Sequence, residues 1–210
     1  MWYSVFTMTE NAQGLIDIGK LVLIFAKVNR VTYHEDGVRP ESDTDHTVML
    51  SVVACALGKK LYPDLDLGKV AQFTIVHDLV EAYAKDTDSF GLSEEEKNAK
   101  EKREHEAYLR IEQEFTSIFP WIPETIAAYE KLDTKEARFV KTVDKCLTKI
   151  THVLNGGVYF KKRGLGKEQM WNDYQTMVRT AEVKYGKEFP EVIALIDELI
   201  EEARKATYGD

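Results

Sequence analysis

Apolar residues recur at helical spacing along most of the chain. Between residues 10 and 30 they form a single stripe of Leu15, Ile18, Leu21, Val22, Phe25 and Val28. The same spacing predicts helices over residues 43–61, 67–84, 93–118, 123–132 and 134–154, and one or two closing helices over residues 167–206. Residues 67–84 are apolar on nearly every side, which is typical of a helix buried at the centre of a fold. The pattern therefore predicts an all-α fold.

Turn and capping signals separate these helices. Residues 31–42 form a polar segment broken by a glycine and a proline, which we expect to be a loop. Ser93 and Glu96 match a capping box at the start of a long charged helix. The sequence NGG at residues 155–157 predicts a helix end with left-handed glycines, and KKRGLGK at residues 161–167 predicts a basic loop.

The domain organisation follows from the length and from the absence of boundaries. A chain of 210 residues with 44% hydrophobic residues is long enough for one sizeable core. The sequence shows no convincing strand, internal repeat, low-complexity tract or linker. We therefore expect one compact domain over residues 1–210, with a core at about residues 15–155 and a helical extension over residues 156–210.

The charge balance excludes some partners. The formal net charge is −8 and the sequence pI is about 5.3, which argues against a nucleic-acid polymer because phosphate backbones are bound by clustered Lys and Arg. The best apolar run, LVLIFAKV at residues 21–28, is too short to span a membrane, and the first residues lack a signal-peptide pattern. We therefore expect a cytoplasmic protein that has no membrane partner.

Four ionisable side chains lie on or beside faces that are otherwise apolar: His46, His77, Asp78 and Asp144. Burying such groups is unfavourable unless something compensates them. Each alone has an ordinary explanation, since a core histidine can be hydrogen-bonded and an aspartate can pair with a neighbouring lysine. Together, two imidazoles and two carboxylates are a mixed nitrogen and oxygen set that suits a first-row transition ion with open positions for water and substrate.

Three separated segments carry a resemblance to a known family. They are RPESDTDH at residues 39–46, HDLVEAYAKDT at 77–87 and YEKLDTKEARFVKTVDK at 129–145. In this order they resemble the HD-domain metal-dependent phosphohydrolases, and most of all their bacterial 5′-deoxynucleotidase branch. The resemblance covers about residues 15–155. It implies a compact helical HD fold with the metal site between central helices.

The resemblance also implies a role for each matching residue at the metal. His46, His77, Asp78 and Asp144 would hold one divalent ion, with Mn²⁺ or Co²⁺ expected first and Zn²⁺, Fe²⁺, Ni²⁺ or Mg²⁺ as alternatives. Glu81 falls on the position that orients or activates the attacking water, and Asp78 is the second catalytic candidate.

Further matching residues are implied in substrate binding. Asp86 falls on the position that touches the sugar or phosphate end of a nucleotide, and Arg30 falls on a phosphate-contacting arginine. An arginine can clamp a phosphate through two parallel hydrogen bonds. Arg39 and Lys97 are additional candidates for substrate contacts.

The chain also departs from the pattern of these nucleotidases. They place a tryptophan directly after the arginine, where this chain has Val31, so the selection of the sugar stays open. Few further histidines are present, with His34 in a loop and His105 in a charged helix, which favours one metal over two. Glu81 is followed by Ala82 and not by a second acid, which argues against the alarmone hydrolases.

Three functional hypotheses result. The first is an enzyme that hydrolyses (deoxy)nucleoside 5′-monophosphates to nucleoside and phosphate. The second is a dNTP triphosphohydrolase that releases tripolyphosphate, in which residues 161–167 would contact the phosphates. The third is a nucleotide-binding HD module without catalysis, for which an intact set of metal ligands plus Glu81 would be unnecessary. The resemblance adds the expectation of a homodimer.

Overall fold

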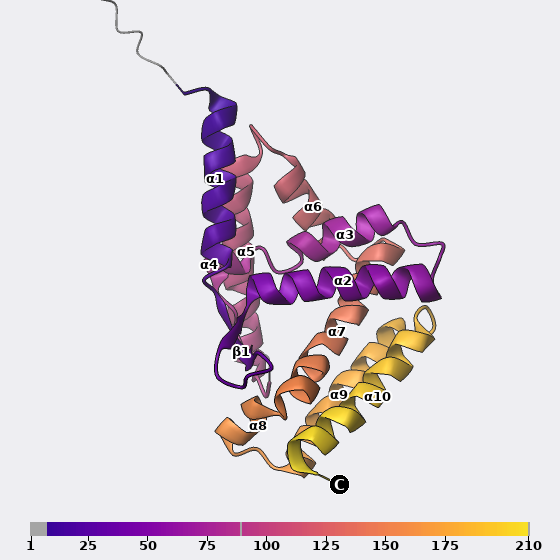
Figure 1. Ribbon diagram of the computed structural model, residues 1–210. Coiled ribbons are helices and arrows are strands. Elements are labelled where there is room, and N and C mark those ends of the chain that lie inside the picture. The colour runs from indigo at the N-terminus through magenta and orange to yellow at the C-terminus, as the bar shows by residue number, and fades with distance from the viewer. Residues whose placement is uncertain (1–7, 89, 210) are drawn as a thin grey trace, which may run out of the picture.

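The computed structural model describes residues 8–88 and 90–209, and these are helical apart from one small hairpin (Figure 1). The elements are α1 (Glu10–Phe25), β1 (Asn29–Tyr33), β2 (Pro40–Ser42), α2 (Asp43–Leu61), α3 (Leu67–Val76), α4 (Glu81–Ala84), α5 (Glu94–Phe115), α6 (Trp121–Glu130), α7 (Lys135–Asn155), α8 (Val158–Arg163), α9 (Lys167–Tyr185) and α10 (Pro190–Tyr208). The predicted all-α class is confirmed. Within the described ranges, no helix is both long enough and apolar enough to cross a membrane.

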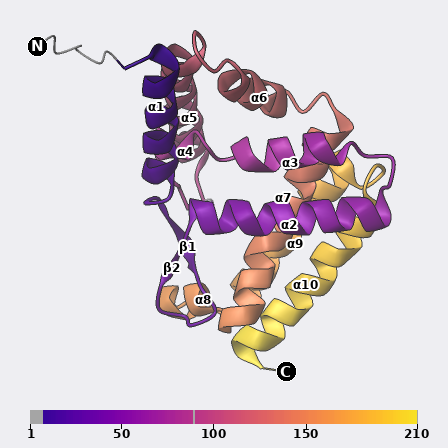
Figure 2. The same cartoon turned by 45° about the horizontal axis from the view of Figure 1, so that its top comes forward.

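Helices α2, α3 and α7 pack against one another at the centre of the fold. Figure 2 shows α2 and α3 side by side, with α7 running across them. Their buried apolar side chains include Leu50 and Ala54 of α2, Val70 and Phe73 of α3, and Val140, Val143 and Leu147 of α7. This packing brings the first turn of α2, the end of α3 and the middle of α7 to one place.

The closing region forms two helices that cover α7. Helix α10 packs along both α7 and α9 (Figure 1). It buries Val192, Ile196, Ile200 and Ala203, which recur at helical spacing on one face. Pro190 stands at the start of α10, where a missing N–H is tolerated.

The helix predicted over residues 67–84 is interrupted. Helix α3 ends at Val76 and α4 begins at Glu81. The intervening turn is tightened by backbone bonds between residues three apart, such as the 2.8 Å bond from the Glu81 N–H to the Asp78 carbonyl. Lys85 then adopts φ +67° and ends α4. The prediction of one continuous helix is therefore wrong, and the break falls at two of the predicted metal ligands.

Residues 31–42 take part in a hairpin where the sequence predicts a loop. The strands are antiparallel, with Asn29 opposite Ser42, Tyr33 opposite Pro40, and an irregularity between these pairs. In the turn, the Asp36 carboxylate accepts two backbone N–H bonds and Gly37 adopts φ +67°. The expectation of no strand is therefore wrong. The two strands are short and polar, so they lack the alternation of apolar residues by which a strand is recognised in a sequence.

Helix α7 ends as predicted, but a further short helix follows it. Gly156 caps α7 in the left-handed region, at φ +66°, and Gly157 follows at φ +68°. The chain then enters α8, so the basic segment 161–167 begins inside a helix and not in a loop. Tyr159 and Phe160 are buried and anchor α8 to the core, which explains why this turn is helical.

Candidate metal centre

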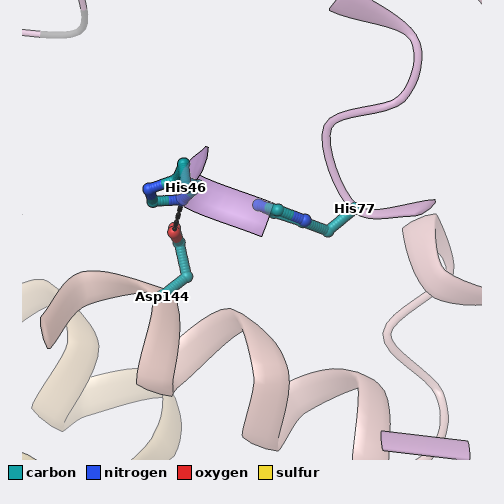
Figure 3. A group of neighbouring side chains, drawn as sticks. All are labelled: His46, His77 and Asp144. Carbon is teal, nitrogen blue, oxygen red and sulfur yellow. Dashed lines mark hydrogen bonds and ion pairs between the residues drawn. The ribbon is translucent and has the colours of Figure 1, made fainter. Parts of the chain in front are cut away.

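Three of the four predicted metal ligands come together between the central helices. His46 lies in the first turn of α2, His77 directly follows α3, and Asp144 lies midway along α7. One ligand atom from each lies within 4.8 Å of the others, and the histidine ring centroids are 5.4 Å apart (Figure 3). Both histidines are buried, whereas the Asp144 side chain is 29% exposed. Two imidazoles and one carboxylate thus form a donor set that is open on one side.

His77 presents a buried nitrogen without a hydrogen-bond partner in the described chain. Its Nδ1 lies 2.8 Å from the Thr74 carbonyl oxygen, and since that oxygen can only accept, Nδ1 donates. In the neutral ring, the Nε2 lone pair then lies 3.0 Å from Asp78 Oδ2 without forming a hydrogen bond. Burial opposes the charged form of His77, but the Asp78 carboxylate raises its pKa. Two electron-pair donors this close together fit a bound metal cation.

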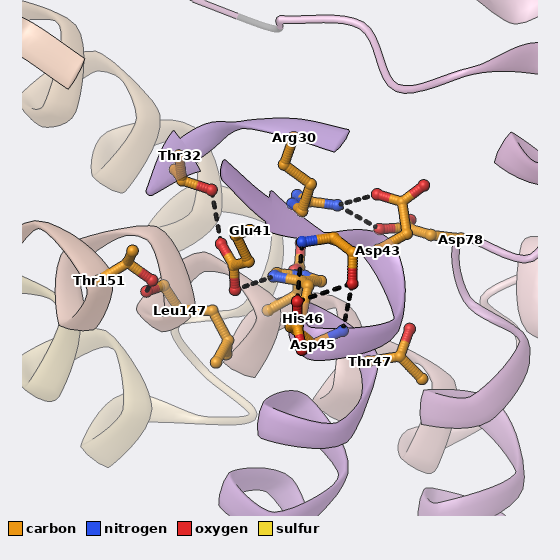
Figure 4. A network of polar contacts seen from close by, with 12 residues as sticks. Arg30, Thr32, Glu41, Asp43, Asp45, His46, Thr47, Asp78, Leu147 and Thr151 are labelled. Carbon is orange, nitrogen blue, oxygen red and sulfur yellow. Dashed lines mark hydrogen bonds and ion pairs between the residues drawn. The ribbon is translucent and has the colours of Figure 1, made fainter. Parts of the chain in front are cut away.

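His46 has a carboxylate on each side of its ring. Its Nε2 lies 2.9 Å from Asp144 Oδ1. Burial by itself would raise the pKa of Asp144, but the contact with His46 opposes burial, and the pKa is lowered. On the other side, Nδ1 lies 3.8 Å from Glu41 Oε1, and the Thr32 hydroxyl donates to Glu41 Oε2 at 2.5 Å (Figure 4). A carboxylate behind a ligating histidine orients the ring and increases its basicity. The sequence shows Glu41 only as part of a matching segment, and its role depends on the unpredicted hairpin.

Arg30 connects the metal donors to a group of acids. Its Nη1 lies 3.0 Å from Asp78 Oδ2 and 3.3 Å from Asp43 Oδ1 (Figure 4). The same atom lies 3.9 Å from Glu81 Oε2. Asp43 is completely buried and was missed in the sequence. The available signal was its position at the start of α2, three residues before His46, which by itself suggests only a favourable charge at a helix N-terminus.

The carboxyl groups around Arg30 are too crowded to be ionised together. Burial, followed by the carboxylates of Asp78, Asp86 and Asp43, raises the pKa of Glu81 to about 10. Burial raises the pKa of Asp43 to about 7, although Arg30 opposes this, and burial also raises the pKa of Asp86. Oxygen atoms of Asp43, Glu81 and Asp86 approach within 4.8 Å of one another. Glu81 therefore holds a proton beside the metal donors unless another cation approaches.

A cavity of about 450 Å³ opens beside this site. Arg30, Asp86 and Lys97 line it together with Asp144. Arg39 is exposed in the turn of the hairpin and is not among the described residues that line the cavity. Three of the four predicted substrate-binding residues therefore share one cavity with a metal ligand, and Arg39 does not.

A second cavity, of about 400 Å³, borders His77 and Asp78 from another side. Its other polar walls include Lys100 and Glu104 of α5 and Lys141 of α7. Asp144 therefore lines one cavity and His77 and Asp78 line the other, while His46 lines neither.

Sequence comparisons place these features among known proteins. A family model described as HD domain matches residues 26–185. The 5′-deoxynucleotidase HDDC2 of Xenopus laevis is 30% identical over 139 residues, which cover 64% of this chain and 65% of that protein. The 5′-deoxynucleotidase hdd1 of Schizosaccharomyces pombe is 29% identical over 113 residues, which cover 51% of this chain and 54% of that protein. The chain thus spans less than two thirds of the length of either relative.

Two solved structures share the fold. A predicted metal-dependent phosphohydrolase from Magnetospirillum magnetotacticum MS-1 superposes with a TM-score of 0.70 at 20% identity, over 93% of this chain and 98% of that one. A conserved hypothetical protein from Pyrococcus furiosus superposes with a TM-score of 0.58 at 24% identity, over 90% and 99%. At these identities the likeness concerns the fold alone.

Proposed function

Because this chain belongs to the HD-domain family, we propose that it is a metal-dependent phosphohydrolase that converts (deoxy)nucleoside 5′-monophosphates to nucleoside and phosphate. The observation that carries the proposal is the unpartnered Nε2 of His77, which faces Asp78, with His46 and Asp144 close by. The two 5′-deoxynucleotidase relatives support the choice of substrate class.

His46, His77, Asp78 and Asp144 would hold one divalent ion, with Mn²⁺ or Co²⁺ proposed first. When bound, the ion supplies Lewis-acid chemistry, because it neutralises phosphoryl charge and makes a water more acidic. The nitrogen and oxygen donor set is compatible with such ions. The Thr74 carbonyl fixes the orientation of the His77 ring by a hydrogen bond. The Glu41 carboxylate, 3.8 Å from His46 Nδ1, favours His46 electrostatically without a hydrogen bond.

The chain's own side chains would position the phosphate and handle the proton. Arg30 lies in the cavity beside Asp144, and its planar guanidinium suits a phosphate group. Glu81 is buried 3.9 Å from both Arg30 Nη1 and Lys100 Nζ. The surrounding carboxylates favour its neutral form, in which Glu81 can give a proton to the leaving oxygen. These cations favour its ionised form, and with a further cation bound nearby Glu81 would be able to take a proton from water.

The contacts of the basic segment 161–167 favour a monophosphate over a triphosphate. None of these described residues lines the cavity. Arg163 pairs with Asp88 and contacts the Tyr159 hydroxyl, while Lys162 Nζ lies 3.7 Å above the Tyr33 ring. Arg163 and Lys162 are thus engaged by other partners, and this segment adds no cation to the lining of the cavity.

Product analysis tests the proposal. Purified protein with Mn²⁺ or Co²⁺ is incubated with NMPs, dNMPs, NTPs and dNTPs, and the products are separated by ion exchange. We expect nucleoside and orthophosphate from monophosphates, loss of turnover in Asp78→Asn, and normal turnover in Asp64→Asn, an exposed control. Tripolyphosphate from dNTPs, or no turnover despite bound metal, would contradict the proposal.

Two further expectations accompany the proposal. We place the protein in the cytoplasm, because its sequence shows neither a membrane-spanning run nor a signal-peptide pattern, and we expect a homodimer from the family resemblance. Sedimentation equilibrium would measure the mass directly, and a monomer at micromolar concentration would remove the second expectation.

A further inference from the structure

The 450 Å³ cavity is also lined by a polar cluster that lies further along α7 than Asp144 and has no role in the chemistry above. Its members are Thr148, Lys149 and His152 of α7 and Tyr174 of α9, and all four line the cavity. Lys149 and His152 are almost completely buried, at 1% and 3% exposed. Buried polar groups that line a substrate cavity commonly orient the substrate.

A directed chain of hydrogen bonds links the cluster. Lys149 Nζ donates to Thr148 Oγ1 at 3.1 Å. The Thr148 hydroxyl donates to the Tyr174 oxygen. Burial raises the pKa of Tyr174 well above 10, so the phenol keeps its proton, and it lies 2.5 Å from His152 Nδ1. Each link fixes the direction of the next, so His152 Nδ1 accepts.

This direction determines what His152 offers to the cavity. Burial lowers the pKa of His152 to about 3, so the ring is neutral and carries one proton. Because Nδ1 accepts from Tyr174, that proton is on Nε2. Nε2 is buried and has no partner in the described chain. The cluster therefore ends in an unused hydrogen-bond donor, and an unpaired buried donor is unfavourable unless a ligand or water satisfies it.

The walls around this donor suit a planar ring. Tyr159 lies parallel to the His152 ring, with centroids 5.8 Å apart and planes at 15°. Phe90 meets Tyr159 edge to face, and both rings line the cavity with Tyr174. Aromatic side chains of this kind stack on nucleobases. A planar heterocycle with a hydrogen-bond acceptor at its edge matches both the walls and the donor.

The spacing along α7 links this cluster to the metal centre. Thr148 and His152 follow Asp144 by four and eight residues, so His152 lies about 12 Å further along the helix axis, at about 1.5 Å per residue. This separation is comparable with the reach of a nucleoside monophosphate from its phosphate to the far edge of its base. A phosphate at Arg30 and Asp144 would thus place the base at His152.

We propose that His152 Nε2 is the base-recognition donor of this enzyme, held in its donating form by Tyr174, Thr148 and Lys149. It selects bases with a carbonyl oxygen where adenine and cytosine carry an amino group, namely 6-oxopurines and 4-oxopyrimidines. An amino group at that position would set donor against donor. The inference rests on the proposed nucleotidase function, because it assumes that the phosphate is bound at Arg30.

Two measurements test the inference separately from the function. The first is the ratio of kcat/KM for dGMP over dAMP, and for dTMP over dCMP. The second is calorimetric binding of deoxyguanosine and deoxyadenosine to chelator-treated protein, which requires neither metal nor hydrolysis. The variants are His152→Ala, His152→Gln, which retains a donor, and Tyr174→Phe, which removes the group that fixes the proton. Tyr208→Phe is the control, since its hydroxyl binds the Leu165 carbonyl outside the cavity.

We expect wild type to prefer the oxo bases by about tenfold or more in both measurements, as one lost buried hydrogen bond implies. The preference should disappear in His152→Ala, persist in part in His152→Gln, decrease in Tyr174→Phe and stay unchanged in Tyr208→Phe. Equal hydrolysis of all four dNMPs, or a preference unaffected by His152→Ala and Tyr174→Phe, would overturn the inference while the nucleotidase function stands. Selective nucleoside binding without hydrolysis of any nucleotide would support the base site and remove the proposed function.

Discussion

Lys149 provides a prediction about stability because it is a buried cation without a carboxylate partner in the described structure. Its Nζ contacts Thr148 Oγ1 and Met177 Sδ and lies 4.4 Å above the Tyr174 ring. Burial, and secondarily Lys145, lowers its pKa from 10.5 to about 7. The unfolded chain therefore binds one more proton than the folded protein between these pH values, and stability should rise with pH in that window.

The magnitude follows from the two pKa values. At pH 6 the full gap between 10.5 and about 7 opposes folding, which amounts to about 5 kcal/mol at roughly 1.4 kcal/mol per pH unit. At pH 9 the folded side chain is neutral, and only the gap from 9 to 10.5 remains, about 2 kcal/mol. Lys149→Met removes the titration, so its stability relative to wild type should be higher at pH 6 than at pH 9 by about 3 kcal/mol.

Urea unfolding followed by circular dichroism, at pH 6 and pH 9 without metal, measures this difference. Contacts that methionine cannot replace change the relative stability of Lys149→Met equally at both pH values. The difference between pH 6 and pH 9 therefore reports only the titration of Lys149. Lys59→Met, at an exposed position, is the control and should show no such difference. A relative stability of Lys149→Met that is equal at the two pH values would refute the reasoning.

Three further predictions follow from individual contacts. Glu41→Gln should weaken Mn²⁺ binding by about 10- to 100-fold in a calorimetric titration, because it removes the carboxylate behind His46, whereas the exposed Glu35→Gln should not. Arg30→Lys should lower kcat/KM for monophosphates by roughly tenfold or more, since lysine lacks the planar guanidinium group of arginine. Arg39→Lys, in the exposed turn of the hairpin, is the control and should have little effect on kcat/KM. A larger loss in Arg39→Lys than in Arg30→Lys would place the phosphate elsewhere. Gly157→Ala should lower the free energy of unfolding by about 3 kcal/mol in denaturant unfolding. The alanine would be strained in the left-handed region, and its Cβ would lie 2.0 Å from Thr207 Oγ1. Gly164 is also in the left-handed region but has open space around it, so Gly164→Ala should lower the free energy of unfolding by only about 1 kcal/mol. Equal losses in the two variants would show that the contact with Thr207 is relieved by a shift of neighbouring atoms.

Much of the fold was predictable because helical periodicity is a local signal. The stripes that predict the helices around 43–61 and 134–154 are the faces that α2 and α7 bury. The break between α3 and α4 was not predictable, since residues 67–84 contain neither a proline nor an interior glycine at the break. It arises from a tightened turn around His77 and Asp78, which depends on what those residues contact.

The candidate site was predictable only where a residue type is out of place. His46, His77 and Asp144 stand out on apolar faces, and the structure brings them together. Glu41 and Asp43 lie in a polar segment, where nothing local distinguishes a buried carboxylate from an exposed one. Their burial comes from long-range contacts with β1, and the sequence shows no convincing strand there.

The polar cluster further along α7 illustrates the same limit. Lys149 and His152 follow Asp144 on α7, so polar residues at helical spacing beyond the last ligand were visible in the sequence. Their link to Tyr174 joins residues 22 positions or more apart and required the packing of α9 against α7.

Metal titration with parallel detection of phosphate release tests the central claim most directly. Mn²⁺ is added in steps to chelator-treated protein, bound ion is measured by calorimetry, and orthophosphate from dNMPs is measured on the same samples. We expect one ion per chain, with hydrolysis rising in proportion to occupancy, and neither binding nor hydrolysis in His77→Ala. Hydrolysis that persists in the chelated protein, or an ion that binds fully while no monophosphate is hydrolysed, would contradict the account.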